Sequence, residues 1–124
     1  MDIIISNSAN EPIYEQIANQ LKYSIISGEL KEGDALPSIR SLAKELHISV
    51  ITTKRAYEEL ENEGFINKVT GKGTFIAPQN QDLMKERKLK IIEEKLLEAV
   101  NAAQIIEMSL SELQEMIKIL YEGE

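Results

Sequence analysis

The stretch SIRSLAKELHISVITTKRAYEELENEG, residues 38–64, contains two short segments with helical periodicity, separated by only a few residues. Ser38 and Ser49 each precede one segment, and a serine hydroxyl can accept a hydrogen bond from a free backbone N–H at a helix start. The side chains expected to face inward recur three or four positions apart: Ile39, Leu42, Ala43 and Leu46, then Thr53, Ala56, Tyr57 and Leu60. The pattern predicts two packed helices joined by a tight turn at His47.

A further helix is expected upstream of these two. Its apolar residues recur every four positions and form one buried stripe: Ile13, Ile17, Leu21 and Ile25. Pro12 suits the first turn of such a helix, and Gly28 would end it in a left-handed conformation. The dipeptide Ala35-Leu36 should then be briefly extended before Pro37.

Two β-rich runs follow the helices, FINKV at residues 65–69 and TFIA at residues 74–77. The glycines of TGKG between them suit a tight turn, which predicts a β-hairpin. The order helix, short helix, tight turn, helix and hairpin is that of a winged helix-turn-helix domain. We therefore expect a mainly α fold with a small β-hairpin wing.

The hairpin tip also contains a lysine between glycines, as nucleotide-binding loops do. A Walker loop, however, requires G-x-x-x-x-G-K-[ST] followed by a helix. Here Gly73 follows Lys72, no glycine lies five residues before Gly71, and the chain continues as a strand that Pro78 ends. Spacing and context therefore argue against a phosphate-binding enzyme. The flexible tip with its lysine could instead approach the sugar-phosphate backbone of a duplex.

The formal net charge of −7 at first argues against a nucleic-acid partner. The charges are unevenly placed, however, because residues 47–57 and 65–80 contain no acid. Local contacts, and not the total charge, decide how a protein binds DNA phosphates. The acid-free start of the second helix of the pair is therefore predicted to enter the major groove of double-stranded DNA.

The C-terminal third is predicted to form a helical hairpin. Apolar residues are spaced alternately three and four apart, as in a coiled coil, and Ser109 with Glu112 forms a capping box at the start of the second helix. Two helices bury too little surface to be stable alone, so we expect a second copy of the chain to pack against them. The candidate dimerisation residues are Leu89, Ile92, Leu96, Ala99, Ala103, Ile106, Leu110, Leu113, Ile117 and Leu120.

Other classes of function find little support in the sequence. No apolar run is long enough to cross a membrane, and the absence of cysteine is compatible with the cytoplasm, where we expect the protein to be. No nucleophile-base pair or carboxylate dyad suggests an enzyme. The single histidine, His47, is a poor metal site without clustered carboxylates, so neither a metal nor a cofactor is expected.

Several spaced motifs resemble the DNA-binding domain of GntR-family bacterial transcription regulators. They are L-P-S-x-R-x-L-A from Leu36, A-x-x-x-L-x-x-x-G from Ala56, and the G-K-G-T-F wing from Gly71, within a match over roughly residues 12–77. The short two-helix tail looks like the YtrA-type branch, which lacks the large effector domain of its relatives. The resemblance implies a sequence-specific regulator with residues 1–78 as the DNA-binding domain and residues 79–124 as the dimerisation tail.

The resemblance also implies which residues contact DNA: Arg40 on the first helix of the pair, residues 49–52 and Lys54 on the second, and residues 70–72 in the wing. With Ser38 and Arg55 added, the candidate set is Ser38, Arg40, Ser49, Val50, Ile51, Thr52, Lys54, Arg55, Thr70, Gly71 and Lys72. Arg40, Lys54 and Arg55 could instead form surface ion pairs or a solvated face.

Two residues depart from the family pattern. Many members carry arginine at the position of Val50, so a guanine-reading side chain is missing there, and Val50 and Ile51 favour contact with thymine methyl groups. His47 stands where the family usually has glycine, but histidine is among the residues that tolerate a positive φ.

The resulting hypothesis is a homodimeric repressor that binds a pseudo-palindromic operator. A protein-interaction adaptor built on a winged helix is the alternative, although the acid-free residues 47–57 favour DNA. The tail leaves no room for an effector cavity of the usual size within one subunit, and the sequence identifies no effector.

Overall fold

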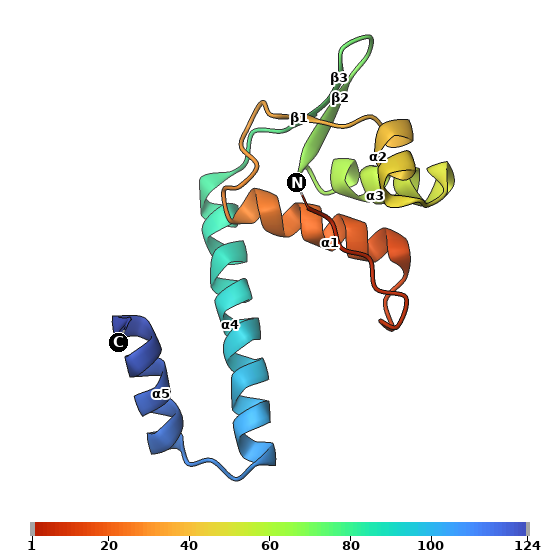
Figure 1. Cartoon of the computed structure of the whole chain (residues 1–124). Helices are drawn as coiled ribbons and strands as arrows, with labels where there is room; N and C mark the ends of the chain where they lie inside the picture. The colour runs from red at the N-terminus through yellow and green to blue at the C-terminus, as the bar shows by residue number, and fades with distance from the viewer. Residues whose placement is uncertain (1, 124) are drawn as a thin grey trace. The chain divides into compact units, whose positions relative to one another are not determined.

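The computed structural model describes residues 2–123. The chain forms two compact units that divide between Met84 and Lys85. The first contains three helices and a small sheet, and the second contains most of one long helix and a shorter helix (Figure 1). The mainly α winged helix-turn-helix fold predicted from the sequence is therefore confirmed.

The core of the first unit lies among α1 (Ile13–Ile26), α2 (Ile39–Leu46) and α3 (Val50–Asn62). Both α1 and α2 pack against α3, which is the central helix. The largest fully buried side chains come from all three helices and the segment after α3: Ile17, Leu21, Leu42, Thr53, Leu60 and Phe65. The inward-facing residues predicted for α3 are all buried.

The turn between α2 and α3 depends on two serine caps and one left-handed residue. Ser38 Oγ accepts the N–H of Ser41 at 3.1 Å, and Ser49 Oγ accepts the N–H of Thr52 at 3.0 Å. His47 has φ 57° and ψ 43°, which is the left-handed conformation predicted for this corner. That conformation lets the N–H of Ile48 donate to the carbonyl of Ala43 at 3.0 Å, so α2 ends and the chain turns into α3.

The sheet has three antiparallel strands in the order β1-β3-β2: β1 (Ala35–Leu36), β2 (Ile66–Val69) and β3 (Gly73–Ile76). β2 starts one residue later than predicted, and β3 starts and ends one residue earlier than predicted. Ala35 pairs with Phe75 and Leu36 with Thr74, so the extended dipeptide is a third strand that the sequence analysis had not predicted. Val69 pairs with Gly73, which leaves residues 70–72 as the tip of the wing.

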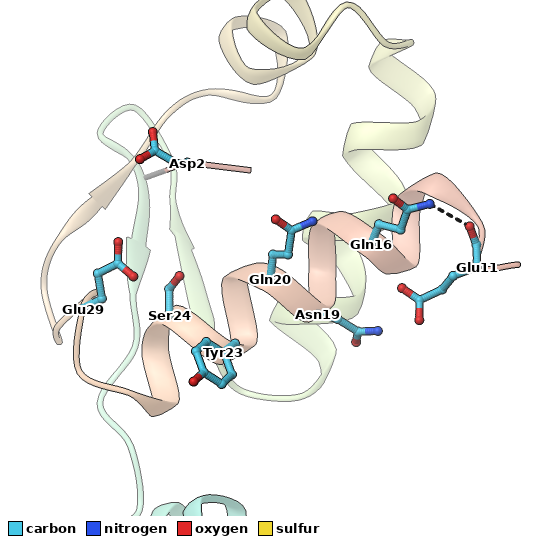
Figure 2. Close-up of a pocket in the computed structure, with 8 residues that line it drawn as sticks. All are labelled: Asp2, Glu11, Gln16, Asn19, Gln20, Tyr23, Ser24 and Glu29. Atoms are coloured by element: carbon cyan, nitrogen blue, oxygen red, sulfur yellow. Dashed lines mark hydrogen bonds between the residues drawn. The ribbon is translucent and has the colours of Figure 1, made fainter. Parts of the chain in front are cut away.

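The segment before α1 is held by two glutamines one helical turn apart. Gln20 donates to the carbonyl of Ile4 at 2.7 Å and accepts its N–H at 2.9 Å. Gln16 does the same with Ser6, at 3.0 and 2.8 Å, and also donates to the carbonyl of Glu11 at 2.9 Å (Figure 2). The two side-chain amides thus each bind the N–H and the carbonyl of one residue of the N-terminal segment.

The second unit consists mainly of α4 (Gln81–Ile105) and α5 (Leu110–Glu122). Ser109 Oγ accepts the N–H of Glu112 at 3.1 Å, which confirms the predicted cap. The chain reverses direction between the helices, as expected for a helical hairpin (Figure 1). The two helices are not closely packed against each other.

Candidate nucleic-acid interface

The first turn of α3 presents uncharged side chains to solvent. Val50 is 49% exposed and Ile51 is 80% exposed, although both are large and apolar. Ser49 and Thr52 beside them are linked, because Ser49 Oγ donates to Thr52 Oγ1 at 2.8 Å while it caps the helix. The start of α3 is therefore a rigid surface with two exposed apolar side chains.

A groove of about 720 Å³ runs between the wing and the start of α2. Three cations line it, Arg40 from α2, Lys68 from β2 and Lys72 from the wing tip, and none of the lining residues is acidic. The predicted residues Ser38, Thr70 and Gly71 lie in the same groove. Gly71 has φ 77°, which few other residues adopt, so the turn needs a glycine and brings the backbone to the surface.

A second hollow of about 390 Å³ lies between α2 and the start of α3. Arg40 and Lys44 line it together with Val50, and again no acid is present. Because Arg40 lines both hollows, it joins the groove at the wing to the first turn of α3. The structure thus brings the wing, Arg40 and the start of α3 into one continuous surface.

Lys44 and Lys68 contribute to this surface but were not among the candidate residues. In the sequence, Lys44 stands among the basic residues upstream of the acid-free hairpin, and Lys68 adds charge to the wing beside Lys72. Only the pairing of β2 with β3, and the packing of α2 on α3, show that both lysines lie beside Arg40.

Five predicted residues do not line these hollows: Ser49, Ile51 and Thr52, which belong to the first turn of α3 or its cap, and Lys54 and Arg55, which make contacts elsewhere. The guanidinium of Arg55 stacks over the ring of Tyr14 at 3.9 Å, and its Nη2 donates to Tyr14 Oη at 3.3 Å. Lys54 pairs with Glu58 at 3.8 Å and lies near the base of the wing with Lys68. Arg55 is therefore engaged with α1 and not with the surface formed by Arg40 and the wing.

Tyr14 is itself part of a short chain of polar contacts. Its hydroxyl donates to Glu15 Oε1 at 3.0 Å, and this hydrogen bond raises the pKa of Tyr14 above its ordinary value, while the Arg55 charge lowers it. These contacts join the start of α1 to the middle of α3.

Acidic side chains lie mainly in other places, apart from Glu58 and Glu61, which line a small hollow with Lys54 and Lys68 at the base of the wing. Glu59 in the second half of α3 and Glu63 at its C-cap pair with Lys22 of α1. A hollow of about 360 Å³ beside α1 is lined by Asp2, Glu11 and Glu29 and by no cation (Figure 2). Neither place suits a phosphate backbone, so the surface with Arg40 is the one that fits a nucleic acid.

The tail exposes an unusual amount of apolar surface. Most predicted dimerisation residues are exposed in the single chain, among them Ile106 at 68% and Leu120 at 74%, whereas Ala103 is buried and Ala99 and Leu113 are partly covered. The exposed set also includes residues outside the predicted 3-4 spacing: Leu97, Val100, Ile105, Met116, Ile119 and Tyr121. The apolar surface is therefore wider than a two-helix seam.

Within residues 2–123, no three or more histidine, cysteine, aspartate or glutamate side chains gather as a metal site would require. None of the helices in this part of the chain combines the length and hydropathy that a bilayer crossing demands.

The turn at His47, the acid-free start of α3 and the basic groove at the wing together define a winged helix-turn-helix DNA-binding domain. The family model for bacterial regulatory proteins of the gntR family matches residues 13–76. The chain belongs to this family, which consists of transcription regulators and not of enzymes. It is a GntR-family transcription regulator of the YtrA-like kind.

The similarity to individual relatives extends through the tail. The chain is 38% identical over 116 residues to the HTH-type transcriptional repressor YtrA of Bacillus subtilis, covering 94% of this chain and 89% of that protein. It resembles the structure of a GntR family transcriptional regulator from Listeria monocytogenes with a TM-score of 0.73 and 25% identity, covering 92% and 97% of the two chains. YtrA from Sulfolobus acidocaldarius gives a TM-score of 0.60 and 38% identity, covering 77% and 96%.

Proposed function

We propose that this protein is a cytoplasmic, homodimeric transcription repressor that binds a pseudo-palindromic operator. Residues 1–78 bind the DNA, and residues 79–124 join two copies. Each copy places the start of α3 in a major groove, with the wing on the neighbouring backbone. The repressor role is supported by the Bacillus subtilis relative, which is itself described as a repressor.

The observation that carries this proposal is the continuous acid-free surface formed by the wing, Arg40 and the start of α3. Cations on this surface are positioned to neutralise phosphates, and each neutralised phosphate releases counterions from the duplex. The first turns of α2 and α3 also leave backbone N–H groups that can bind a phosphate oxygen. We therefore assign backbone contacts to Arg40, Lys44, Lys68 and Lys72, and base contacts to the first turn of α3.

Dimerisation is supported by the tail. Helices that expose many large apolar side chains in a single chain usually cover them by association. A twofold dimer would present two identical recognition helices, and such dimers bind half-sites whose centres are about 34–36 Å, or a multiple of this distance, apart. The operator would then be an inverted repeat.

Selection of bound duplexes from a random pool tests the proposal directly. We expect an inverted-repeat motif, and we expect the purified chain to bind the selected duplex at least about tenfold more tightly than a shuffled duplex at the same salt concentration. Equal binding of both duplexes would contradict the proposal and favour the protein-interaction adaptor.

A further inference from the structure

The start of α3 offers an unusual set of groups to the bases. In residues 49–53 there is no charged side chain, and Ser49 uses its hydroxyl proton in the hydrogen bond to Thr52. Val50 and Ile51 are the large side chains that remain exposed there. An apolar side chain cannot satisfy the hydrogen-bonding groups of a base edge, so it must contact an apolar group or leave polar atoms unpaired.

The nearby cations do not belong to the first turn of α3. Arg55 is directed toward Tyr14 on α1, and Lys54 pairs with Glu58 in the next turn of α3. Arg40 lines the hollow that Val50 also lines, but from the side of α2. Val50 and Ile51 are therefore the large exposed apolar side chains of the first turn of α3, beside the linked hydroxyls of Ser49 and Thr52.

We infer that Val50 and Ile51 determine operator specificity by contacting the C5-methyl groups of thymines in the major groove. This inference rests on the proposed function. The thymine methyl is the apolar group that the major groove presents, and it distinguishes T·A from the other base pairs. Each half-site should therefore contain one or two thymines beneath the first turn of α3, next to the phosphates that Arg40 contacts.

The test removes the methyl group from the DNA and the side chain from the protein. In the duplex obtained by selection, each thymine of one half-site is replaced in turn by deoxyuridine, which lacks only the methyl group. The full chain, Ile51→Ala, Val50→Ala and the control Ile4→Ala are titrated against each duplex. Ile4 is 76% exposed, which closely matches Ile51, but it lies beside α1. Circular dichroism verifies that all variants retain their helices.

We expect deoxyuridine at one or two positions to weaken binding of the unchanged chain by about fourfold per methyl, the effect of leaving one such group unburied. The Ile4→Ala protein should show the same loss. For Ile51→Ala or Val50→Ala, deoxyuridine at the corresponding position should make less than a twofold difference, because the methyl group no longer has a partner.

Three results would overturn the inference. If every deoxyuridine duplex binds as the thymine duplex does, Val50 and Ile51 do not read methyl groups, although the proposed function stands. The same conclusion follows if the loss persists undiminished in both alanine variants. If the selected and shuffled duplexes bind equally, the proposed function is wrong. The inference that Val50 and Ile51 contact thymine methyl groups is then wrong as well.

A substitution in the other direction provides an independent measurement. Val50→Arg places at this position a planar donor pair, which matches the guanine O6 and N7 acceptors in the major groove. A repeated selection with this variant should recover guanine in place of thymine at the affected position. Recovery of the unchanged motif would show that Val50 does not face the bases.

Discussion

Arg40 lines both hollows of the DNA-binding surface, and its guanidinium makes no ion pair or hydrogen bond to any other residue within 2–123. We expect Arg40→Ala to weaken operator binding by about 1–3 kcal/mol, because the loss of a charge-assisted hydrogen bond to a phosphate has about this magnitude. A titration by fluorescence anisotropy at fixed salt concentration measures the change. Arg40→Lys keeps the charge but not the planar pair of donors, and should recover only part of the loss. Unchanged binding by Arg40→Ala would refute the docking of this surface on DNA.

Lys72 at the wing tip provides a different measurement, namely the dependence of binding on salt. A lysine that contacts a phosphate contributes about one to the slope of log K against log salt, whatever the sequence of the duplex. Lys72→Ala should therefore weaken operator and shuffled DNA alike and reduce the slope by about one. Lys118→Ala, an exposed lysine of α5, removes the same charge and should leave the slope unchanged. Identical slopes for Lys72→Ala and the unchanged chain would remove the wing from the interface.

At the scale of the elements, the contact between Arg55 and Tyr14 joins α3 to α1. If Arg55 serves this contact, Arg55→Ala should lower the free energy of unfolding by about 0.5–1 kcal/mol, the usual contribution of an exposed cation–π pair. The salt slope of DNA binding should not change. Chemical denaturation and the salt titration together measure both quantities.

Arg55→Lys distinguishes the two roles of this side chain. A lysine retains the positive charge that a phosphate contact needs, but it stacks less well over an aromatic ring. We expect Arg55→Lys to lose part of the stability and keep the DNA affinity. A reduced salt slope in Arg55→Ala would show that Arg55 contacts DNA after all, as the sequence analysis had proposed.

Tyr57 links α3 to the start of α2, because its hydroxyl donates to the carbonyl of Pro37 at 2.7 Å. Burial raises the pKa of Tyr57 well above its ordinary value. The folded state therefore holds this proton more tightly than the unfolded state, whose tyrosine loses it near pH 10. This contribution to stability is fully present below about pH 10 and declines as the pH rises above it.

Tyr57→Phe tests this dependence. The variant should lose about 1–2 kcal/mol near neutral pH, because the carbonyl of Pro37 loses its donor. Its stability should then fall less steeply with pH above about 10 than that of the unchanged chain. Denaturation at several alkaline pH values measures the difference, and parallel curves would show that Tyr57 is not the residue responsible.

The elements themselves were largely predictable from local signals. Ser38, Ser49 and Ser109 cap helices where the sequence placed them, and the left-handed turn at His47 was anticipated from residue type. The pairing of β1 with β3 and the engagement of Arg55 with Tyr14 were not predicted. Each contact joins residues about 40 positions apart, and the periodicity of a sequence does not predict contacts over such a distance.

Gln16 and Gln20 illustrate the same limit. A glutamine on an exposed face of a helix is usually solvated, so nothing in the sequence indicates that these two hold the N-terminal segment. For the candidate site, the residue types of the first turn of α3 and the absence of acidic residues there could be read directly from the sequence. That Lys44 and Lys68 line the same hollows as Arg40 became evident only from the fold.

At the scale of the whole molecule, the decisive quantity is the association of two chains through the tail. Leu96 lies within the predicted seam of α4 and is about half exposed. Leu96→Glu places a charge in that seam while keeping a good helix former. Gln104→Glu adds the same charge at an exposed polar position of the same helix. Light scattering should give twice the chain mass of 14.0 kDa for the unchanged protein and for Gln104→Glu, and a single mass for Leu96→Glu.

Loss of the dimer should weaken binding to the full operator but not binding to a single half-site. Two linked recognition helices gain from effective concentration, so Leu96→Glu should bind the full operator more weakly by about 100-fold or more. Its affinity for a duplex with a single half-site should remain unchanged, because the surface formed by Arg40, the wing and α3 is intact. A single-chain mass for the unchanged protein, or full operator affinity in a monomeric Leu96→Glu variant, would show that the tail does not couple the two half-sites. The apolar residues of α4 and α5 would then require another partner.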